Sequence, residues 1–74
     1  MAVSYNKLWK LLIDKKMSKA EMRLAAGISP NTLTKLNRDE EVTMTIINKI
    51  CTALQVDVGE VMEFLPDSAT SENE

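Results

Sequence analysis

The stretch SKAEMRLAAGISPNTLTKL, residues 18–36, decides the fold, because it carries the start and stop signals of two short helices. Ser18 and Glu21 have the S-x-x-E spacing of a capping box, in which each side chain satisfies a backbone amide of the other residue. Gly27 most easily takes the left-handed conformation that closes a helix. Ser29 and Pro30 then begin another helix, since serine caps and proline is tolerated at the first position. The stretch therefore predicts two helices joined by a turn.

Hydrophobic spacing on either side of this stretch predicts three further helices. Apolar residues from Tyr5 to Leu12 recur at helical spacing and indicate a helix over residues 5–15, capped by Ser4. Thr43 is expected to cap a fourth helix, and residues 57–65 to form a short fifth one that ends at Pro66. The expected fold class is a compact all-α domain of five helices, with a helix-turn-helix at the second and third. Several further side chains are expected to pack in its core: Trp9, Met22, Met44, Cys51 and Met62.

Length and composition exclude several classes of protein. A chain of 74 residues has room for one domain, which we place at residues 1–66. It is too short for a deep catalytic cleft. Residues 67–74 are polar or acidic apart from Ala69 and predict a disordered acidic tail. With one cysteine and no histidine there is no basis for a disulfide, a zinc site or a histidine-dependent active site. We therefore expect no enzymatic activity, no cofactor, no metal and no small-molecule substrate.

No leading apolar run resembles a signal peptide or a membrane span, so the sequence predicts a cytoplasmic protein without a membrane partner. The overall charge of −2 is unevenly divided. Residues 1–38 carry eight lysines and arginines against two acids, and residues 39–74 carry one lysine against nine acids. This division predicts one face suited to phosphates and another that repels them.

A helix-turn-helix projects the first turn of its second helix, which has the width to enter the major groove of duplex DNA. Asn31 can pair with adenine, Lys35 with guanine, and Thr34 can contact a thymine methyl. Helix starts and neighbouring cations supply the candidate phosphate-binding residues: Ser18, Lys19, Ser29, Arg38, Thr43 and Thr45. Arg23 is a further candidate.

Four segments, at residues 19–22, 26–29, 31–36 and 50–57, resemble the Cro/C1-type helix-turn-helix regulators, also called the XRE family. The ends of the chain, at residues 4–14 and 61–67, are similar to the small stand-alone members of bacteria and phages. The resemblance implies a lambda-repressor-like fold and a transcriptional regulator or repressor that binds double-stranded DNA as a homodimer on a palindromic operator. It places the base-reading positions on Pro30, Asn31 and Lys35.

The sequence departs from the family pattern in three ways. Arg23 stands where relatives prefer alanine, so either the helices cross more widely or the arginine bends out to solvent. Pro30 has no polar side chain with which to read a base. Glu40 and Glu41 occupy a loop where many relatives have cations for phosphate.

The alternative hypothesis is a protein-binding module, or an antitoxin-like partner of a basic protein, that uses the same scaffold. Its docking surface would be an apolar patch near Val58, Met62, Phe64 and Leu65. The same surface would serve a homodimer.

Overall fold

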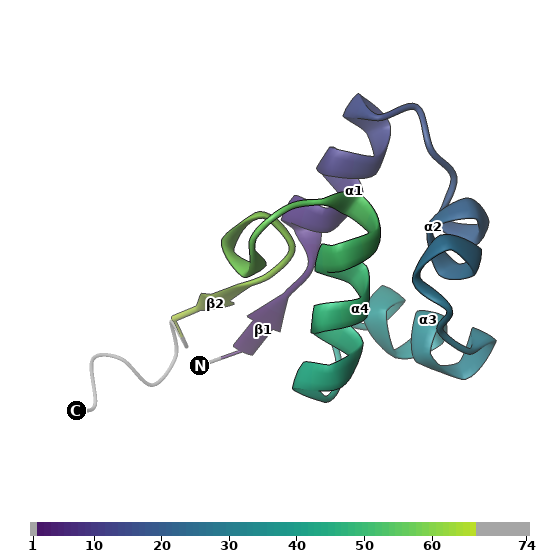
Figure 1. Cartoon of the computed structure of the whole chain (residues 1–74). Coiled ribbons are helices and arrows are strands. Elements are labelled where there is room, and N and C mark those ends of the chain that lie inside the picture. The colour runs from purple at the N-terminus through teal and green to yellow at the C-terminus, as the bar shows by residue number, and fades with distance from the viewer. Residues whose placement is uncertain (1, 67–74) are drawn as a thin grey trace, which may run out of the picture.

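Four helices form most of the domain in the computed structural model, which describes residues 2–66. They are α1 (Asn6–Asp14), α2 (Lys19–Ala26), α3 (Pro30–Asn37) and α4 (Met44–Leu54). A 3-10 turn, η1 (Val58–Glu60), follows α4, and two short strands, β1 (Ala2–Ser4) and β2 (Glu63–Leu65), join the two ends of the domain. In Figure 1, α4 lies between this small sheet on one side and α2 and α3 on the other.

The prediction of five helices was wrong at the C-terminal end. Asp57 caps only a single turn, through a bond of 2.8 Å from the Val58 amide to its carboxylate. The chain then becomes extended, because Glu63–Leu65 pairs antiparallel with Ala2–Ser4 in the register Val3 to Phe64. The domain is thus mostly helical with a two-stranded sheet, and not all-α.

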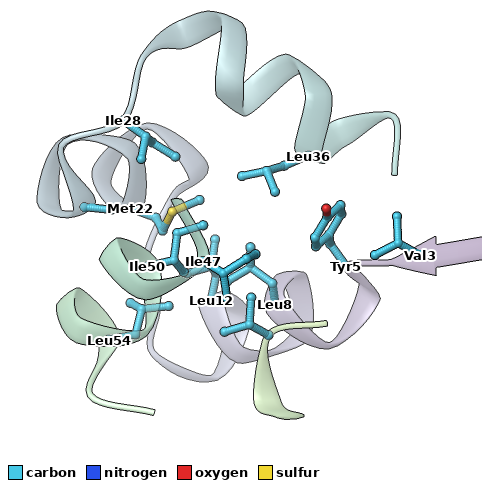
Figure 2. Packing of buried hydrophobic residues seen from close by; sticks show 12 residues of the cluster. Val3, Tyr5, Leu8, Leu12, Met22, Ile28, Leu36, Ile47, Ile50 and Leu54 are labelled. Atoms are coloured by element: carbon cyan, nitrogen blue, oxygen red, sulfur yellow. The ribbon is translucent and has the colours of Figure 1, made fainter. Parts of the chain in front are cut away.

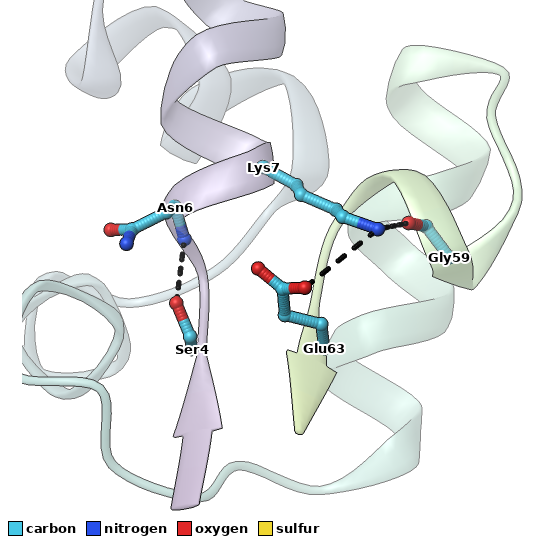
Figure 3. Close-up of polar contacts among 5 residues, drawn as sticks. All are labelled: Ser4, Asn6, Lys7, Gly59 and Glu63. Carbon is cyan, nitrogen blue, oxygen red and sulfur yellow. Dashed lines mark hydrogen bonds and ion pairs between the residues drawn. The ribbon is translucent and has the colours of Figure 1, made fainter. Parts of the chain in front are cut away.

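The start of the first helix is also one residue later than the sequence indicated. Ser4 lies in β1 and is 1% exposed, and Tyr5 occupies the N-cap position of α1. The Ser4 hydroxyl still accepts a hydrogen bond of 3.3 Å from the Asn6 amide (Figure 3). Ser4 therefore still accepts a hydrogen bond from the first turn of α1, because β1 ends directly before the helix.

A single hydrophobic core joins all four helices and β1. Met22 of α2, Leu36 of α3 and Ile50 of α4 are each 0% exposed, and Figure 2 shows them converging with Leu8 and Leu12 of α1. Each fully buried side chain of this kind contributes roughly 1.5–3 kcal/mol. The core therefore fixes α2 and α3 against α4 and sets the position of the turn between them.

The core predictions held for Met22 but not for Met44, whose side chain is 68% exposed at the first turn of α4. Trp9, Cys51 and Met62 are half-buried and pack against the core. Met44 lies one turn before Ile47, the first buried residue of α4.

None of the helices within residues 2–66 is long and apolar enough to cross a membrane. The predicted acidic tail, residues 67–74, lies outside the described residues.

Candidate nucleic-acid interface

The predicted capping box at the start of α2 is confirmed. The Glu21 amide donates to the Ser18 hydroxyl at 3.0 Å, and the Ser18 amide donates to the Glu21 carboxylate at 2.7 Å. These bonds satisfy two of the four amides that a helix start leaves without a partner. The amides of Lys19 and Ala20 make no hydrogen bond to another described residue, so they are available to an anion at the positive end of the helix dipole.

The turn between α2 and α3 has the predicted geometry. Gly27 is left-handed, with φ of 70°, and its amide bonds back to the Leu24 carbonyl at 3.3 Å. The Ile28 amide reaches the Arg23 carbonyl at 3.1 Å, which completes a Schellman motif. Ile28 is 4% exposed, so the turn is anchored in the core immediately before α3 begins.

Arg23 is neither packed between α2 and α3 nor bent fully out to solvent, the two alternatives that the sequence left open. Its side chain is half-buried, and its guanidinium donates to the Ile28 carbonyl at 3.3 Å. The arginine therefore follows the surface of the turn and bonds to its backbone. This contact gives Arg23 a structural role in holding the turn, in addition to any contact with phosphate.

The start of α3 is confirmed as predicted, with Ser29 as the N-cap and Pro30 at the first helical position. The Ser29 hydroxyl accepts from the Thr32 amide at 3.2 Å and lies 3.0 Å from the Thr32 hydroxyl. Leu33 and Leu36 face the core, and Leu36 is fully buried. The opposite face of α3 is directed away from the core.

Four exposed side chains share that outer face, at spacings of three and four residues: Asn31, Thr34, Lys35 and the C-cap residue Arg38. Pro30, which precedes them, is exposed as well. The Thr34 hydroxyl donates to the Pro30 carbonyl at 3.1 Å, so its hydrogen is already used within the helix. Within residues 2–66, the polar ends of Asn31 and Lys35 form no hydrogen bond or ion pair, and these groups and the methyl group of Thr34 are free to meet a base edge.

Lys19 occupies a bridging position that the sequence did not predict. Its ammonium lies 4.2 Å from the centre of the Trp9 ring and donates to the Asn37 side-chain oxygen at 2.7 Å. The lysine thus joins α1, α2 and the end of α3 at the surface. No local pattern connects these residues, because they lie ten and eighteen positions apart, so Trp9 and Asn37 could not have been assigned to the interface from sequence.

The loop after α3 is tied to the first helix through Tyr5. The Tyr5 amide donates to the Asp39 carboxylate at 3.1 Å, and the Tyr5 hydroxyl donates to the Glu40 carbonyl at 2.7 Å. Burial raises the pKa of the Tyr5 hydroxyl above its ordinary value, and the nearby carboxylates of Asp39 and Glu41 add to that rise. The acidic loop is therefore held at a fixed position beside α3.

The phosphate-binding candidates on this flank differ in their availability. Arg38 forms an exposed ion pair of 3.8 Å with Glu40, which offsets part of its charge. The Thr43 hydroxyl caps α4 by accepting from the Ile46 amide at 3.3 Å, and Thr45 is exposed in the first turn of α4. Glu40 thus affects the interface through Arg38 as well as through its own charge.

Comparison with known proteins bears on what this arrangement does. Residues 7–67 match the family model described as a Cro/C1-type HTH DNA-binding domain. Among solved structures, the chain is similar to the crystal structure of the transcriptional regulator VanUg, Form II. The two have 50% sequence identity and a TM-score of 0.86, over 89% of this chain and 88% of that one. No curated protein sequence matches.

Proposed function

The chain belongs to the Cro/C1-type family of helix-turn-helix DNA-binding domains and is a transcriptional regulator of that type, and we propose that it reads duplex DNA with α3 in the major groove. The observation that carries this proposal is the outer face of α3, where Asn31, Thr34 and Lys35 are exposed together at the start of a projecting helix. A helix with side chains is about 10–12 Å across and fits a groove about 12 Å wide.

Base recognition falls to the first six residues of α3. The Asn31 amide pairs with the N6 and N7 of adenine, and the Lys35 ammonium with O6 or N7 of guanine. Thr34 presents its methyl group to thymine, because its hydroxyl is bonded to the Pro30 carbonyl. Pro30 contributes shape only, through van der Waals contact with the groove. Each of the two polar pairings discriminates against a wrong base by roughly 1–3 kcal/mol.

Phosphate contacts position α3 from two flanks of the helix. On one side the free amides of α2, the Ser18 cap and the Lys19 ammonium meet a phosphate. The start of α3 adds Ser29. On the other side, the loop and the start of α4 provide Arg38, Thr43 and Thr45. Lys19 must share or leave its contact with Asn37 to reach a phosphate, which makes this contact sensitive to DNA binding.

Residues 1–66 act as the DNA-binding unit in this proposal, and residues 67–74 form an acidic tail outside that unit. The chain binds a palindromic operator as a homodimer, with half-sites about 34–36 Å apart on one side of the duplex. It works in the cytoplasm, where a bacterial or phage genome is accessible, and it needs no cofactor.

Selection from a random duplex pool tests this function directly, since it requires no knowledge of the operator. We expect a palindromic sequence to be enriched. Asn31→Ala and Lys35→Ala should each lose about 5- to 150-fold in affinity for that sequence and much less for random DNA, the range that corresponds to about 1–3 kcal/mol. Lys10→Ala on α1 is the matched control and should bind as the parent chain does. If Asn31→Ala and Lys35→Ala bind the enriched sequence unchanged, α3 does not read bases.

A further inference from the structure

The acidic loop, residues 38–43, joins α3 to α4 and carries an aspartate at a position where glycine is usual. Two loop amides bond back to the carbonyls of Lys35 at 2.9 Å and Leu36 at 3.2 Å, which is the Schellman pattern of a helix end. Asp39 is the left-handed residue of this motif, with φ of 56°. The same motif closes α2, and there the left-handed residue is Gly27. A side chain costs free energy in this conformation, so the aspartate requires a compensating contact.

The Asp39 carboxylate has a partner from the other end of the domain. It accepts a hydrogen bond of 3.1 Å from the amide of Tyr5, the residue at the N-cap position of α1. Tyr5 is 1% exposed, so the carboxylate satisfies a backbone donor in a residue that is almost fully buried. Glycine at position 39 would relieve the backbone but would remove this acceptor. The contact with Tyr5 therefore offsets the unfavourable conformation of Asp39.

Tyr5 holds the acidic loop at a second point. Its hydroxyl donates to the Glu40 carbonyl at 2.7 Å, and its ring belongs to the core cluster that also contains Leu36 and Val3 (Figure 2). Two bonds from one buried residue to consecutive loop residues fix both the position and the direction of the loop. Val42, farther along the loop, packs against the same cluster. The acidic loop is thus anchored to the core through side chains that lie far apart in sequence.

We infer that Asp39 and Tyr5 are positioning residues for DNA binding, an inference that rests on the proposed function. Neither residue contacts DNA in this assignment. They hold the acidic loop so that the phosphate-binding candidates at its two ends, Arg38 and Thr43, reach the DNA backbone together. A loop released from these bonds holds the binding arrangement for only part of the time, and the apparent affinity falls by that fraction.

The charge of Asp39 by itself has the opposite effect on DNA binding. A carboxylate beside a phosphate-binding surface repels DNA, so its removal strengthens binding if charge is its only role. Asparagine and glycine at position 39 both remove this charge, and both tolerate a positive φ. Only asparagine retains a side-chain oxygen that accepts from the Tyr5 amide. The two substitutions therefore separate the role of the hydrogen bond from that of the charge.

Fluorescence anisotropy with the enriched operator sequence and with a random duplex compares the two variants. Asp39→Asn should bind at least as tightly as the parent chain, because the hydrogen bond remains and a negative charge is lost. Asp39→Gly should bind about 2- to 12-fold more weakly than Asp39→Asn, the factor to which one net hydrogen bond corresponds. The factor should be the same on both duplexes, since a phosphate carries no sequence information. Tyr5→Phe keeps the buried ring, loses the hydroxyl and should weaken binding by a factor in the same range.

Amide hydrogen exchange of the free chain tests the anchoring without DNA. The Tyr5 amide should exchange faster in Asp39→Gly than in Asp39→Asn, and urea titration verifies that each variant is fully folded in the binding assay. Equal affinity of the two Asp39 variants, equal exchange of the Tyr5 amide in them, or parent-like binding by Tyr5→Phe overturns the inference. If the parent chain binds duplex DNA, such a result refutes the positioning role alone, whereas a folded parent chain that binds no duplex refutes the proposed function as well.

Discussion

Replacing Lys19 by methionine tests how the domain holds phosphate. The unbranched methionine side chain keeps much of the apolar stem beside Trp9 and removes the ammonium that lies 4.2 Å from the ring centre and 2.7 Å from the Asn37 oxygen. An exposed cation–π contact contributes about 0.5–1 kcal/mol. With the exposed hydrogen bond added, the free energy of unfolding should fall by about 1 kcal/mol, which lowers Tm by about 4–8 °C in a domain of this size.

The effect on DNA binding follows from the number of phosphates neutralised. One lost phosphate contact lowers the slope of log affinity against log salt by about 0.9. Between about 50 and 200 mM salt, the parent chain should therefore lose about 3.5-fold more affinity than Lys19→Met does. The loss should be the same on the selected operator and on random duplex DNA, because a phosphate carries no sequence information. Fluorescence anisotropy with labelled duplexes at several salt concentrations measures both quantities.

Two further variants make the test specific. Lys10→Met removes an equal charge from the side of α1 that adjoins Gly59 and Glu60, and it should leave the slope unchanged. Asn37→Ala leaves the ammonium in place and should also keep the slope. Since Trp9 is the single tryptophan, its emission reports the loss of the ammonium in Lys19→Met and its movement when DNA binds. A Lys19→Met variant with an unchanged salt slope would refute the phosphate role, and a selective loss on the operator would assign Lys19 to base reading.

Three other changes have defined outcomes. Gly27→Ala should lower the free energy of unfolding by about 1–2 kcal/mol in urea titrations, because φ at this position is 70°. The loss should be no larger, since an added Cβ would meet nothing within 4 Å. A loss above about 4 kcal/mol would mean that the turn has no room for the methyl group. Since burial raises the pKa of Tyr5 above 10.0, the folded chain keeps a proton that the unfolded chain releases. Stability should therefore fall as pH rises above about 10, and less steeply in Tyr5→Phe; parallel curves for the two chains would contradict this. Glu40→Lys combined with Glu41→Lys should free Arg38 from its 3.8 Å ion pair with Glu40 and strengthen binding to random DNA at low salt. An unchanged gel shift would show that the acidic loop does not weaken DNA binding.

Sequence alone determined the helix-turn-helix, because the signals for it act within a few residues. The bonds of Ser18 with Glu21, of Ser29 with Thr32 and of Thr43 with Ile46 each span three positions, and the left-handed Gly27 follows from its lack of a side chain. Helical periodicity likewise placed Leu36 and Ile50 in the core, and the residues left on the outer face of α3 followed from the same period.

Tertiary structure alone decided how the ends of the domain and the surroundings of the interface are arranged. The strands Ala2–Ser4 and Glu63–Leu65 are three residues each, too short for an alternating pattern, and they extend because they pair across some sixty positions. The contact of Lys19 with Asn37 spans 18 positions and that of Tyr5 with Asp39 spans 34. Such contacts depend on where the packed core brings distant side chains, and no local spacing encodes that distance.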